Sequence, residues 1–369
     1  MIVTPTPTPS ASATPTPTPT PSPTATPIAN VTATTVATFS APWAMTFLPD
    51  GRLLVTEKAG TLQLVTQAGA KTAVTGVPTV VFSGQLGFQD VILDPGFATN
   101  RRVYLSYAEA GTGGQRLAVA RATLNLDAAA PRLDGLSVIW RAAPTTNGGQ
   151  LGARLAFSPD GAHLFVATGE RQQATPAQDL GGTLGKIVRL TPDGSVPAGN
   201  PFAGNAAARP EIWTLGHRNP YGLAFDAQGR LWEHEMGPAG GDELNLIEPG
   251  RSYGWPNVSN GQNYDGSNIP DHAPGDGYAA PAASWTPVIA PAGLIFYSGN
   301  LFAAWRGDAI IGGLVSGGLV RVRITGTAAA EAQRIPLGQR IREVEQGPDG
   351  AIWVLEDAPG GRLRRLVPA

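Results

Sequence analysis

The sequence contains no cysteine, which excludes disulfide bonds and thiolate metal sites. Charge is also sparse. Only 15% of the 369 residues are charged and the net charge is -2, so the chain lacks the basic field that nucleic acid or an anionic membrane surface would require. No apolar run is long enough to cross a bilayer. The chain is instead rich in turn formers, with 47 Gly and 34 Pro, which predicts many short strands joined by tight turns.

The first 30 residues have a different composition from the rest of the chain. From Thr4 to Pro27, Pro alternates with Thr, Ser and Ala, which predicts an extended linker over residues 1–30 and a folded domain over residues 31–369. Such tracts commonly tether a domain outside the cytoplasm, so we expect a periplasmic, secreted or envelope-tethered protein. The charged start and apolar core of an export signal are missing from this chain. An inert tail is the alternative interpretation.

A loose repeat runs through the remainder of the chain. Each copy is a short apolar segment, a turn of the Pro-Asp-Gly type and a second apolar segment. The copies lie at residues 47–55, 157–166, 225–232 and 347–354. Glycine provides the positive φ that such hairpin turns need. Repeated hairpins without helical periodicity favour an all-β fold, a β-propeller, over a single β-sandwich of unusual size.

Three groups of residues point to an anionic ligand held beside a hard cation. Arg218 and Asn219 precede Pro220, and they offer a guanidinium fork and a neutral amide donor. Gly237-Pro238 is a corner that exposes backbone carbonyls and is followed by an acidic pair; carbonyl and carboxylate oxygens are the ligands that calcium prefers. Arg340 and Arg342 alternate along a strand, so both face one side and suit a ligand with several carboxylates. Solvated or purely structural roles are the alternatives for each group.

Taken together, these segments resemble the soluble quinoprotein sugar dehydrogenases of the glucose/sorbosone dehydrogenase family. The resemblance rests on Leu215-Gly-His-Arg-Asn-Pro220, Glu235-Met-Gly-Pro238, Asp242-Glu-Leu-Asn245 and Tyr253-Gly-Trp-Pro256, and it extends over Val36–Leu366. It implies a six-bladed β-propeller with four-stranded antiparallel blades. It also implies oxidation of the C1 hydroxyl of an aldose to a lactone with pyrroloquinoline quinone (PQQ) and calcium, followed by transfer of electrons to an external acceptor.

The resemblance also implies a role for individual residues. Residues expected to contact the cofactor are Gln85, Arg154, Gln178, Arg218, Asn219, Tyr264, Arg340 and Arg342. Those expected at the calcium ion are Gly237, Pro238, Glu243 and Tyr253. The expected catalytic position is 150, with Arg218 and Asn219 polarising the quinone carbonyls.

Two positions depart from the family pattern. The family places its catalytic base, a histidine, in a Gly-Gly-His-aromatic-Gly-x-Arg segment, and this chain has Gln150 there. A glutamine amide cannot take a proton from a hydroxyl, and a positioned base is worth about 10²–10⁴-fold in rate. The family often has a lysine after Gly-x-Leu, and Val315 stands there in this chain.

These departures leave three interpretations open. The first is a quinone-dependent dehydrogenase with an altered base. The second is a repurposed propeller that binds a saccharide or performs calcium-assisted, non-redox chemistry. The third is a purely structural propeller. The retained Arg-Asn pair, arginine pair and acidic loop favour the first.

Overall fold

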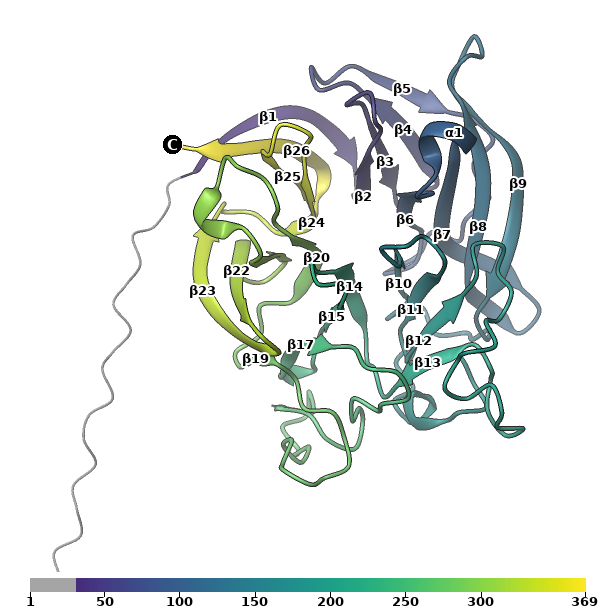
Figure 1. The fold of residues 1–369 in the computed structure, drawn as a ribbon, viewed down its shortest axis with the longest axis vertical. Helices are drawn as coiled ribbons and strands as arrows, with labels where there is room; N and C mark the ends of the chain where they lie inside the picture. The colour runs from purple at the N-terminus through teal and green to yellow at the C-terminus, as the bar shows by residue number, and fades with distance from the viewer. Residues whose placement is uncertain (1–30) are drawn as a thin grey trace, which may run out of the picture.

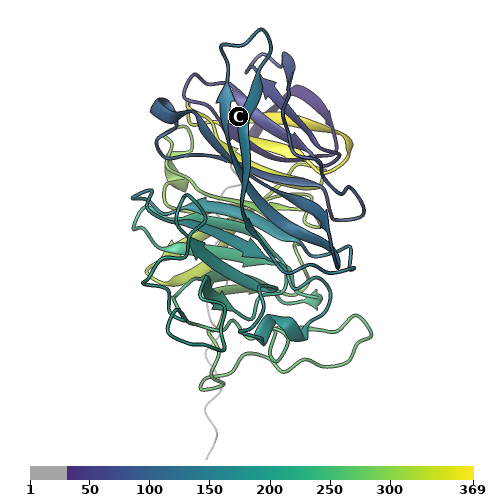
Figure 2. The same cartoon turned by 90° about the vertical axis from the view of Figure 1, so that its right-hand side faces the viewer.

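The protein is a ring of antiparallel sheets around a central axis (Figure 1), seen from the side in Figure 2. The computed structural model describes residues 31–369, and the predicted linker of residues 1–30 lies outside them. Six four-stranded sheets form the ring, which confirms the predicted six-bladed propeller. Among the described residues, no helix has the length and apolar character needed to cross a membrane.

The first three blades use consecutive strands, and the first strand of each is the innermost. The first blade contains β2 (Pro42–Phe47), β3 (Leu53–Glu57), β4 (Thr61–Val65) and β5 (Lys71–Val74). The second contains β6 (Phe88–Leu93), β7 (Arg102–Gly111), β8 (Gly114–Asn125) and β9 (Arg132–Arg141), with the short helix α1 (Phe97–Asn100) after β6. The third contains β10 (Gly152–Phe157), β11 (Leu164–Thr168), β12 (Lys186–Leu190) and β13 (Ile212–Leu215), with the 3₁₀ turn η1 (Thr175–Gln178) after β11.

The other three blades carry the long insert and the ring closure. The fourth contains β14 (Pro220–Phe225), β15 (Leu231–Glu235), β17 (Asp242–Leu246) and β19 (Ala283–Trp285). A small sheet of β16 (Ala239–Gly240) and β18 (Gly261–Gln262) accompanies it. The fifth contains β20 (Pro291–Phe296), β21 (Ala309–Gly313), β22 (Gly318–Thr325) and β23 (Ala328–Pro336), with η2 (Ala303–Trp305) after β20. The sixth contains β24 (Ile341–Gln346), β25 (Ile352–Glu356), β26 (Pro359–Pro368) and β1 (Val31–Ser40).

The repeated sequence segments form the hairpins between the first and second strands of four blades: β2–β3, β10–β11, β14–β15 and β24–β25. In the first of them Gly51 has a φ of 85°, the left-handed conformation that the turn requires. Phe47, just before this turn, packs edge-on against Trp353 of the sixth blade, with ring centroids 5.4 Å apart. The same hairpin therefore shapes its own blade and seals it to its neighbour.

All six inner strands share one burial pattern, in which the first four residues are buried and the last two are partly buried. Each also has an irregular register near its start, where it pairs with the second strand of its blade. Such irregularities redirect side chains and are frequent beside functional sites. Residues at the starts of the inner strands therefore converge on one end of the ring axis.

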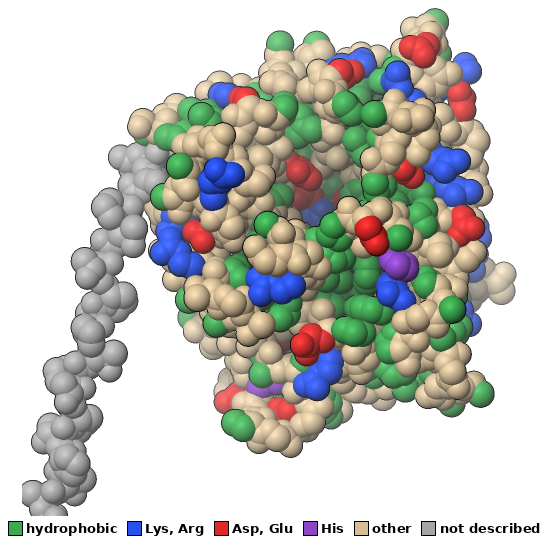
Figure 3. All heavy atoms as spheres, in the orientation of Figure 1, with side chains coloured by type: hydrophobic (Ala, Val, Ile, Leu, Met, Phe, Trp, Pro, Cys, Tyr) green, Lys and Arg blue, Asp and Glu red, His purple; other side chains and the backbone are tan. Residues whose placement is uncertain are grey.

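Charged side chains line the axis itself. Asp90 of β6, Arg154 of β10 and Glu343 and Glu345 of β24 line one cavity there. Figure 3 shows a hollow at the centre of the ring with acidic and basic side chains inside it. Arg154 bonds to Glu343 and lies 3.5 Å from Asp90, and its guanidinium lies over the ring of Trp43 at 4.2 Å. The pairing compensates much of the cost of burying these charges.

Candidate active site

Polar residues from four blades lie at one end of the ring axis, which we call the mouth. Arg218 and Asn219 immediately precede β14, Gln150 lies just before β10, and Arg340 just before β24. Gln85 lies in the loop before β6, and its Oε1 accepts a hydrogen bond of 2.6 Å from the backbone N–H of Gln150. Segments far apart in the sequence thus meet at one end of the ring because each precedes an inner strand.

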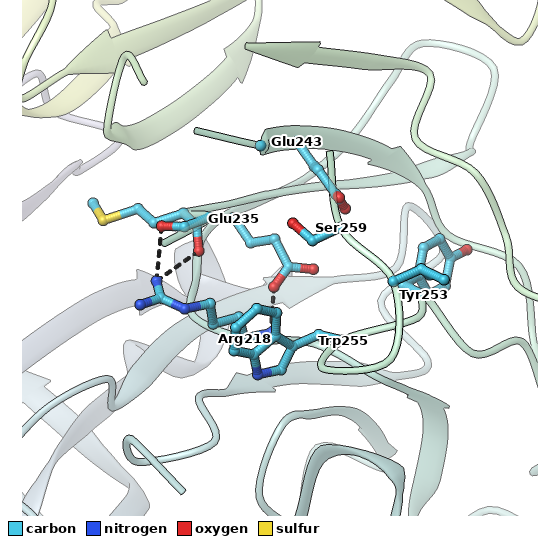
Figure 4. A pocket seen from close by; sticks show the side chains of 10 residues that line it. Arg218, Glu235, Glu243, Tyr253, Trp255 and Ser259 are labelled. Carbon is cyan, nitrogen blue, oxygen red and sulfur yellow. Dashed lines mark hydrogen bonds between the residues drawn. The ribbon is translucent and has the colours of Figure 1, made fainter. Parts of the chain in front are cut away.

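Arg218 is 6% exposed and is held on several sides (Figure 4). Its Nη1 donates to the carbonyls of Met236 and Gly237, both at 2.9 Å, and its Nη2 donates to the Tyr264 hydroxyl at 3.1 Å. Trp255 stacks near the guanidinium, with 5.2 Å to the ring centroid. These contacts fix the plane of the fork, and they leave Nε buried without a partner among the described residues.

Glu235, the last residue of β15, lies beneath the Arg-Asn pair. Its Oε2 accepts hydrogen bonds from the backbone N–H groups of Arg218 and Asn219, the second at 3.3 Å. Its Oε1 lies 3.1 Å from Nδ1 of His217, whose Nε2 is 2.9 Å from the Thr214 hydroxyl. The carboxylate partner assigns the proton to Nδ1, so both ring nitrogens of this fully buried histidine are engaged.

The residues expected at a calcium ion lie on the same side of the mouth. Gly237, Glu243 and Tyr253 line one pocket with Arg218 and Trp255, and Pro238 is buried next in the chain. Figure 4 shows Glu243 and Tyr253 across this pocket from Arg218. The structure therefore brings the predicted acidic loop and the predicted Arg-Asn pair together.

Buried acids surround this pocket. Nδ2 of Asn245 lies 3.2 Å from an oxygen of Glu233 and 3.2 Å from one of Glu243, and His272 Nε2 is 3.6 Å from Glu243. Burial is the main cause that raises the pKa of Glu233 and of Glu243, and the negative charge of Glu235 adds to it. Carboxylates that crowd one another in this way favour a bound cation.

A second set of possible metal ligands lies deeper. His217, Glu233 and Glu235 each place one ligand atom within 4.8 Å of the others. Both ring nitrogens of His217 already have hydrogen-bond partners, Glu235 and Thr214. We therefore describe this set as a hydrogen-bonded support for the Arg-Asn pair.

The two predicted arginines of the sixth blade share one carboxylate. Arg340 Nη2 lies 2.7 Å from one oxygen of Asp357, and Arg342 Nη2 lies 2.9 Å from the other. Lys58 donates to the Gly84 carbonyl at 3.0 Å, and burial together with the positive charge of Arg342 lowers its pKa. Three cations balanced by one anion leave this side of the mouth positive, although position 315 carries an exposed valine.

Gln150 is buried, and the structure gives its side chain a structural partner. Oε1 accepts a hydrogen bond of 3.0 Å from the backbone N–H of Gln172. Residue 150 has a φ of 49°, in the left-handed region. Gly169 lies beside this segment, because its backbone N–H donates to the Leu151 carbonyl at 3.1 Å, and the next residue, Glu170, donates its backbone N–H to the Arg218 carbonyl at 2.9 Å.

The remaining predicted cofactor residues differ in placement. Tyr264 is 77% exposed and reaches Arg218 through its hydroxyl. Gln178 donates to the Trp255 carbonyl at 2.8 Å and accepts from the Ser252 hydroxyl, so it braces the loop behind the mouth. Arg154 is bound within the charged axis and donates to the Tyr221 carbonyl at 2.8 Å. Only its Nη2 has no partner among residues 31–369.

Polar atoms without partners test whether a cofactor fits. Within the described part of the chain, Nε of Arg218, Oδ1 of Asn219, Nη1 of Arg342 and Nε1 of Trp255 are buried without hydrogen bonds. Buried polar atoms in native proteins nearly always have a partner. Donors on opposite sides of one mouth, beside aromatic Trp255 and Tyr264, fit a planar, multiply anionic ligand.

The fold and the site define a six-bladed propeller with a cationic mouth beside a buried acidic loop. Comparison of sequences then gives the family: the profile described as "Glucose / Sorbosone dehydrogenase" matches residues 39–365, so the chain belongs to this family. It is 39% identical over 337 residues to "Aldose sugar dehydrogenase YliI" of Escherichia coli, covering 89% of this chain and 90% of that protein. It is 27% identical over 410 residues to "Quinoprotein glucose dehydrogenase B" of Acinetobacter calcoaceticus, covering 86% and 84%.

Solved structures give the same result. A crystal structure of a glucose dehydrogenase superposes with a TM-score of 0.87 at 42% identity, covering 92% of this chain and 99% of that one. The PQQ-bound form of aldose sugar dehydrogenase from Streptomyces coelicolor superposes with a TM-score of 0.75 at 29% identity, covering 93% and 99%.

Sequence patterns do not single out several residues that the structure places at the mouth. Lys58 and Asp357 follow β3 and β25 and lie beside the arginine pair. Glu170 follows β11 after one glycine. The sequence carries only a weak signal for these residues. Each is charged and lies within two positions of the end of the second strand of its blade, where the chain returns to the mouth.

Proposed function

We propose that this protein is a PQQ- and calcium-dependent oxidoreductase that oxidises the C1 hydroxyl of an aldose to a lactone and passes the electrons to an external acceptor. The observation that carries the proposal is the set of unpartnered buried donors on Arg218, Arg342 and Trp255 around one mouth. Membership of the family supports it, as do relatives named as sugar dehydrogenases and a relative solved with PQQ bound. The Thr/Pro-rich N-terminal tract supports a location outside the cytoplasm.

Different residues would hold different parts of such a cofactor. Arg340, Arg342 and Lys58 offer positive charge to its carboxylates, while Arg218 and Asn219 offer a fork and an amide to its quinone oxygens. Trp255 and Tyr264 offer aromatic faces. When bound, the quinone supplies the two-electron acceptor for a hydride from the sugar.

Calcium fits the opposite side of the pocket. We assign it the Glu243 carboxylate together with the backbone carbonyls of Gly237, Pro238 and Tyr253, which are oxygen donors of the kind this ion takes. A cation there would relieve the burial of the Glu243 charge. The Gly237 carbonyl, which accepts a hydrogen bond from Arg218, would then join the metal and the arginine through one oxygen.

Position 150 favours a second candidate function. Gln150 has no basic atom, and its Oε1 is engaged by Gln172. A propeller that retains the ligand site and has lost the redox reaction would bind a saccharide, or hydrolyse one with calcium. This alternative predicts ligand binding without electron transfer.

The experiment that tests the proposal is a titration of metal-free protein with PQQ and calcium, followed by absorbance, with a dye-linked assay on a panel of aldoses. We expect calcium-dependent binding and measurable turnover, because the charged mouth is intact. Arg342→Met is expected to weaken PQQ binding at least about tenfold by removing a charge-assisted contact. Its control is Arg323→Met, on the exposed surface of β22.

Gln150→His should turn over at least as fast as the wild-type protein, because it places a base at the position where the family has one. The measurement is kcat on the best aldose of the panel at neutral pH, with PQQ affinity measured in parallel. Absence of PQQ binding by both the wild-type protein and Gln150→His would overturn the dehydrogenase proposal and leave the second candidate.

A further inference from the structure

Sugar oxidation needs a group that takes the hydroxyl proton, and two acids and one histidine around the mouth are already engaged. Glu235 accepts three hydrogen bonds from Arg218, Asn219 and His217. Asp357 is shared by two guanidinium groups. His217 is fully buried with both nitrogens bonded. None of these three has a free basic atom facing the mouth.

Glu170 lies between the two segments that define the reaction site. Its backbone N–H bonds to the Arg218 carbonyl. The preceding Gly169 packs so closely on Gln150 that a Cβ there would lie 2.0 Å from the Gln150 carbonyl oxygen. The Glu170 side chain, 2% exposed, therefore starts from the junction of the Gln150 and Arg218 segments.

The Glu170 carboxylate is oriented through one oxygen only. Oε2 accepts hydrogen bonds from the backbone N–H groups of Gln173 and Ala174, the second at 2.6 Å. Within residues 31–369, Oε1 makes no hydrogen bond. One oxygen thus fixes the group, while the lone pairs of the other have no partner within these residues.

The surroundings make Glu170 a stronger base than an ordinary carboxylate. Burial is the largest cause that raises its pKa, the negative charge of Glu235 adds to this, and the positive charge of Arg218 and the two backbone N–H groups oppose it. The neighbouring Arg171 turns away and donates to the carbonyls of Gly149 and Asn147. A carboxylate with a raised pKa is suited to proton transfer.

We propose that Glu170 is the catalytic base of this protein, in the place of the histidine that position 150 lacks. The proposal rests on the proposed function, which supplies the quinone as two-electron acceptor. The C1 hydroxyl of the sugar gives its proton to Oε1 of Glu170. The C1–H bond breaks with its electron pair and leaves as hydride to the quinone, and the C1–O bond becomes the lactone carbonyl. Gln150 then only holds the loop through Gln172.

The test compares Glu170→Gln, Gln150→His and the double variant, with calcium and PQQ saturating. We expect Glu170→Gln to lower kcat by about 10²-fold or more while the PQQ dissociation constant, read by absorbance, changes less than about twofold. The double variant should regain turnover, because histidine at 150 restores a base. Its acidic limb in kcat against pH should move toward the ordinary histidine pKa of about 6.5. Glu331→Gln, on the outermost strand of the fifth blade, is the matched control.

A second variant guards against misfolding of the first. Glu170→Ala should lose turnover, and added formate should restore part of it by supplying a carboxylate in the space vacated. If the wild-type protein oxidises sugar and Glu170→Gln keeps full activity, this inference is overturned and the proposed function stands. Equal loss of PQQ affinity and kcat would also overturn it, since that result indicates a structural role. A wild-type protein that binds PQQ yet turns over only after Gln150→His would show that Glu170 is no base.

Discussion

Glu235 accepts hydrogen bonds from the backbone N–H groups of Arg218 and Asn219, so one buried carboxylate sets the direction of both side chains. The same group bonds to His217, which is anchored by Thr214. Arg218 and Asn219 at the mouth are therefore supported by a chain of residues that lies beneath them. Such outer partners determine how well a site is organised before its ligand arrives.

Glu235→Gln replaces a double acceptor with an amide that offers one carbonyl oxygen. We expect a loss of about 1–3 kcal/mol in the free energy of unfolding, because one or more buried donors lose their partner. PQQ affinity should fall with it, because the Arg218 side chain is no longer held. Thermal unfolding and absorbance titration measure the two effects. Unchanged PQQ affinity would show that Arg218 is positioned by Met236 and Gly237 alone.

Among the elements, β1 is the one that closes the ring. It pairs with β26 from Val31 opposite Pro368 to Ser40 opposite Pro359 and so completes the sixth blade from the other end of the chain. Phe39 of β1 is 2% exposed and packs in the core that joins the first and sixth blades. Closure removes the free strand edges that an open arc of sheets would present.

Phe39→Ala is expected to lower the free energy of unfolding by about 3–5 kcal/mol, the range for removing a buried phenylalanine. Thr34→Ala, on the exposed face of the same strand, should change it by less than about 0.5 kcal/mol. Denaturant midpoints of the two variants test the difference. A similar loss in both would indicate that pairing of the backbone, and not the core contact, holds the strand.

The hairpins were predictable because their turns carry a local signal in Pro-Asp-Gly sequences with a glycine at positive φ. The fifth blade lacks this signal: its first two strands are joined through η2, where Phe302 and Trp305 stack with centroids 4.3 Å apart. Arg218, Asn219, Glu243 and Tyr253 were likewise predictable from short motifs, and the structure places Arg218, Glu243 and Tyr253 around one pocket. The sequence did not predict a place at the mouth for Lys58, Glu170 and Asp357, because their nearness to it depends on closure of the ring and not on neighbours in sequence.

At the scale of the whole molecule, the axis concentrates acids. Burial, with the negative charges of Glu343 and Asp90, raises the pKa of Glu345 to about 8, and burial raises that of Glu343 to about 7. The folded state thus holds the Glu345 proton more tightly than the unfolded chain, where the pKa is near 4.5. This contribution to stability is complete below about pH 4.5 and is lost as pH rises through about 8.

Glu345→Gln removes the titrating group while keeping a similar shape. We expect the melting temperature of the variant to match that of the wild type at pH 5 and to exceed it at pH 9. The gain in the free energy of unfolding at pH 9 should be about 1–2 kcal/mol, less than the full pKa difference implies, because Glu345 lines a cavity. Thermal melts across this range measure the crossover. A constant difference at all pH values would show that the carboxyl is ionised in the folded protein throughout.

Pairing of β1 with β26 has a consequence for how the protein is made. β1 must wait for β26, so the ring cannot close before β26 has been synthesised. This pairing joins residues more than three hundred positions apart, and contacts of such long range are slow to form. A chain that stopped before β26 would leave both β1 and the arc of blades without the partner that seals the ring.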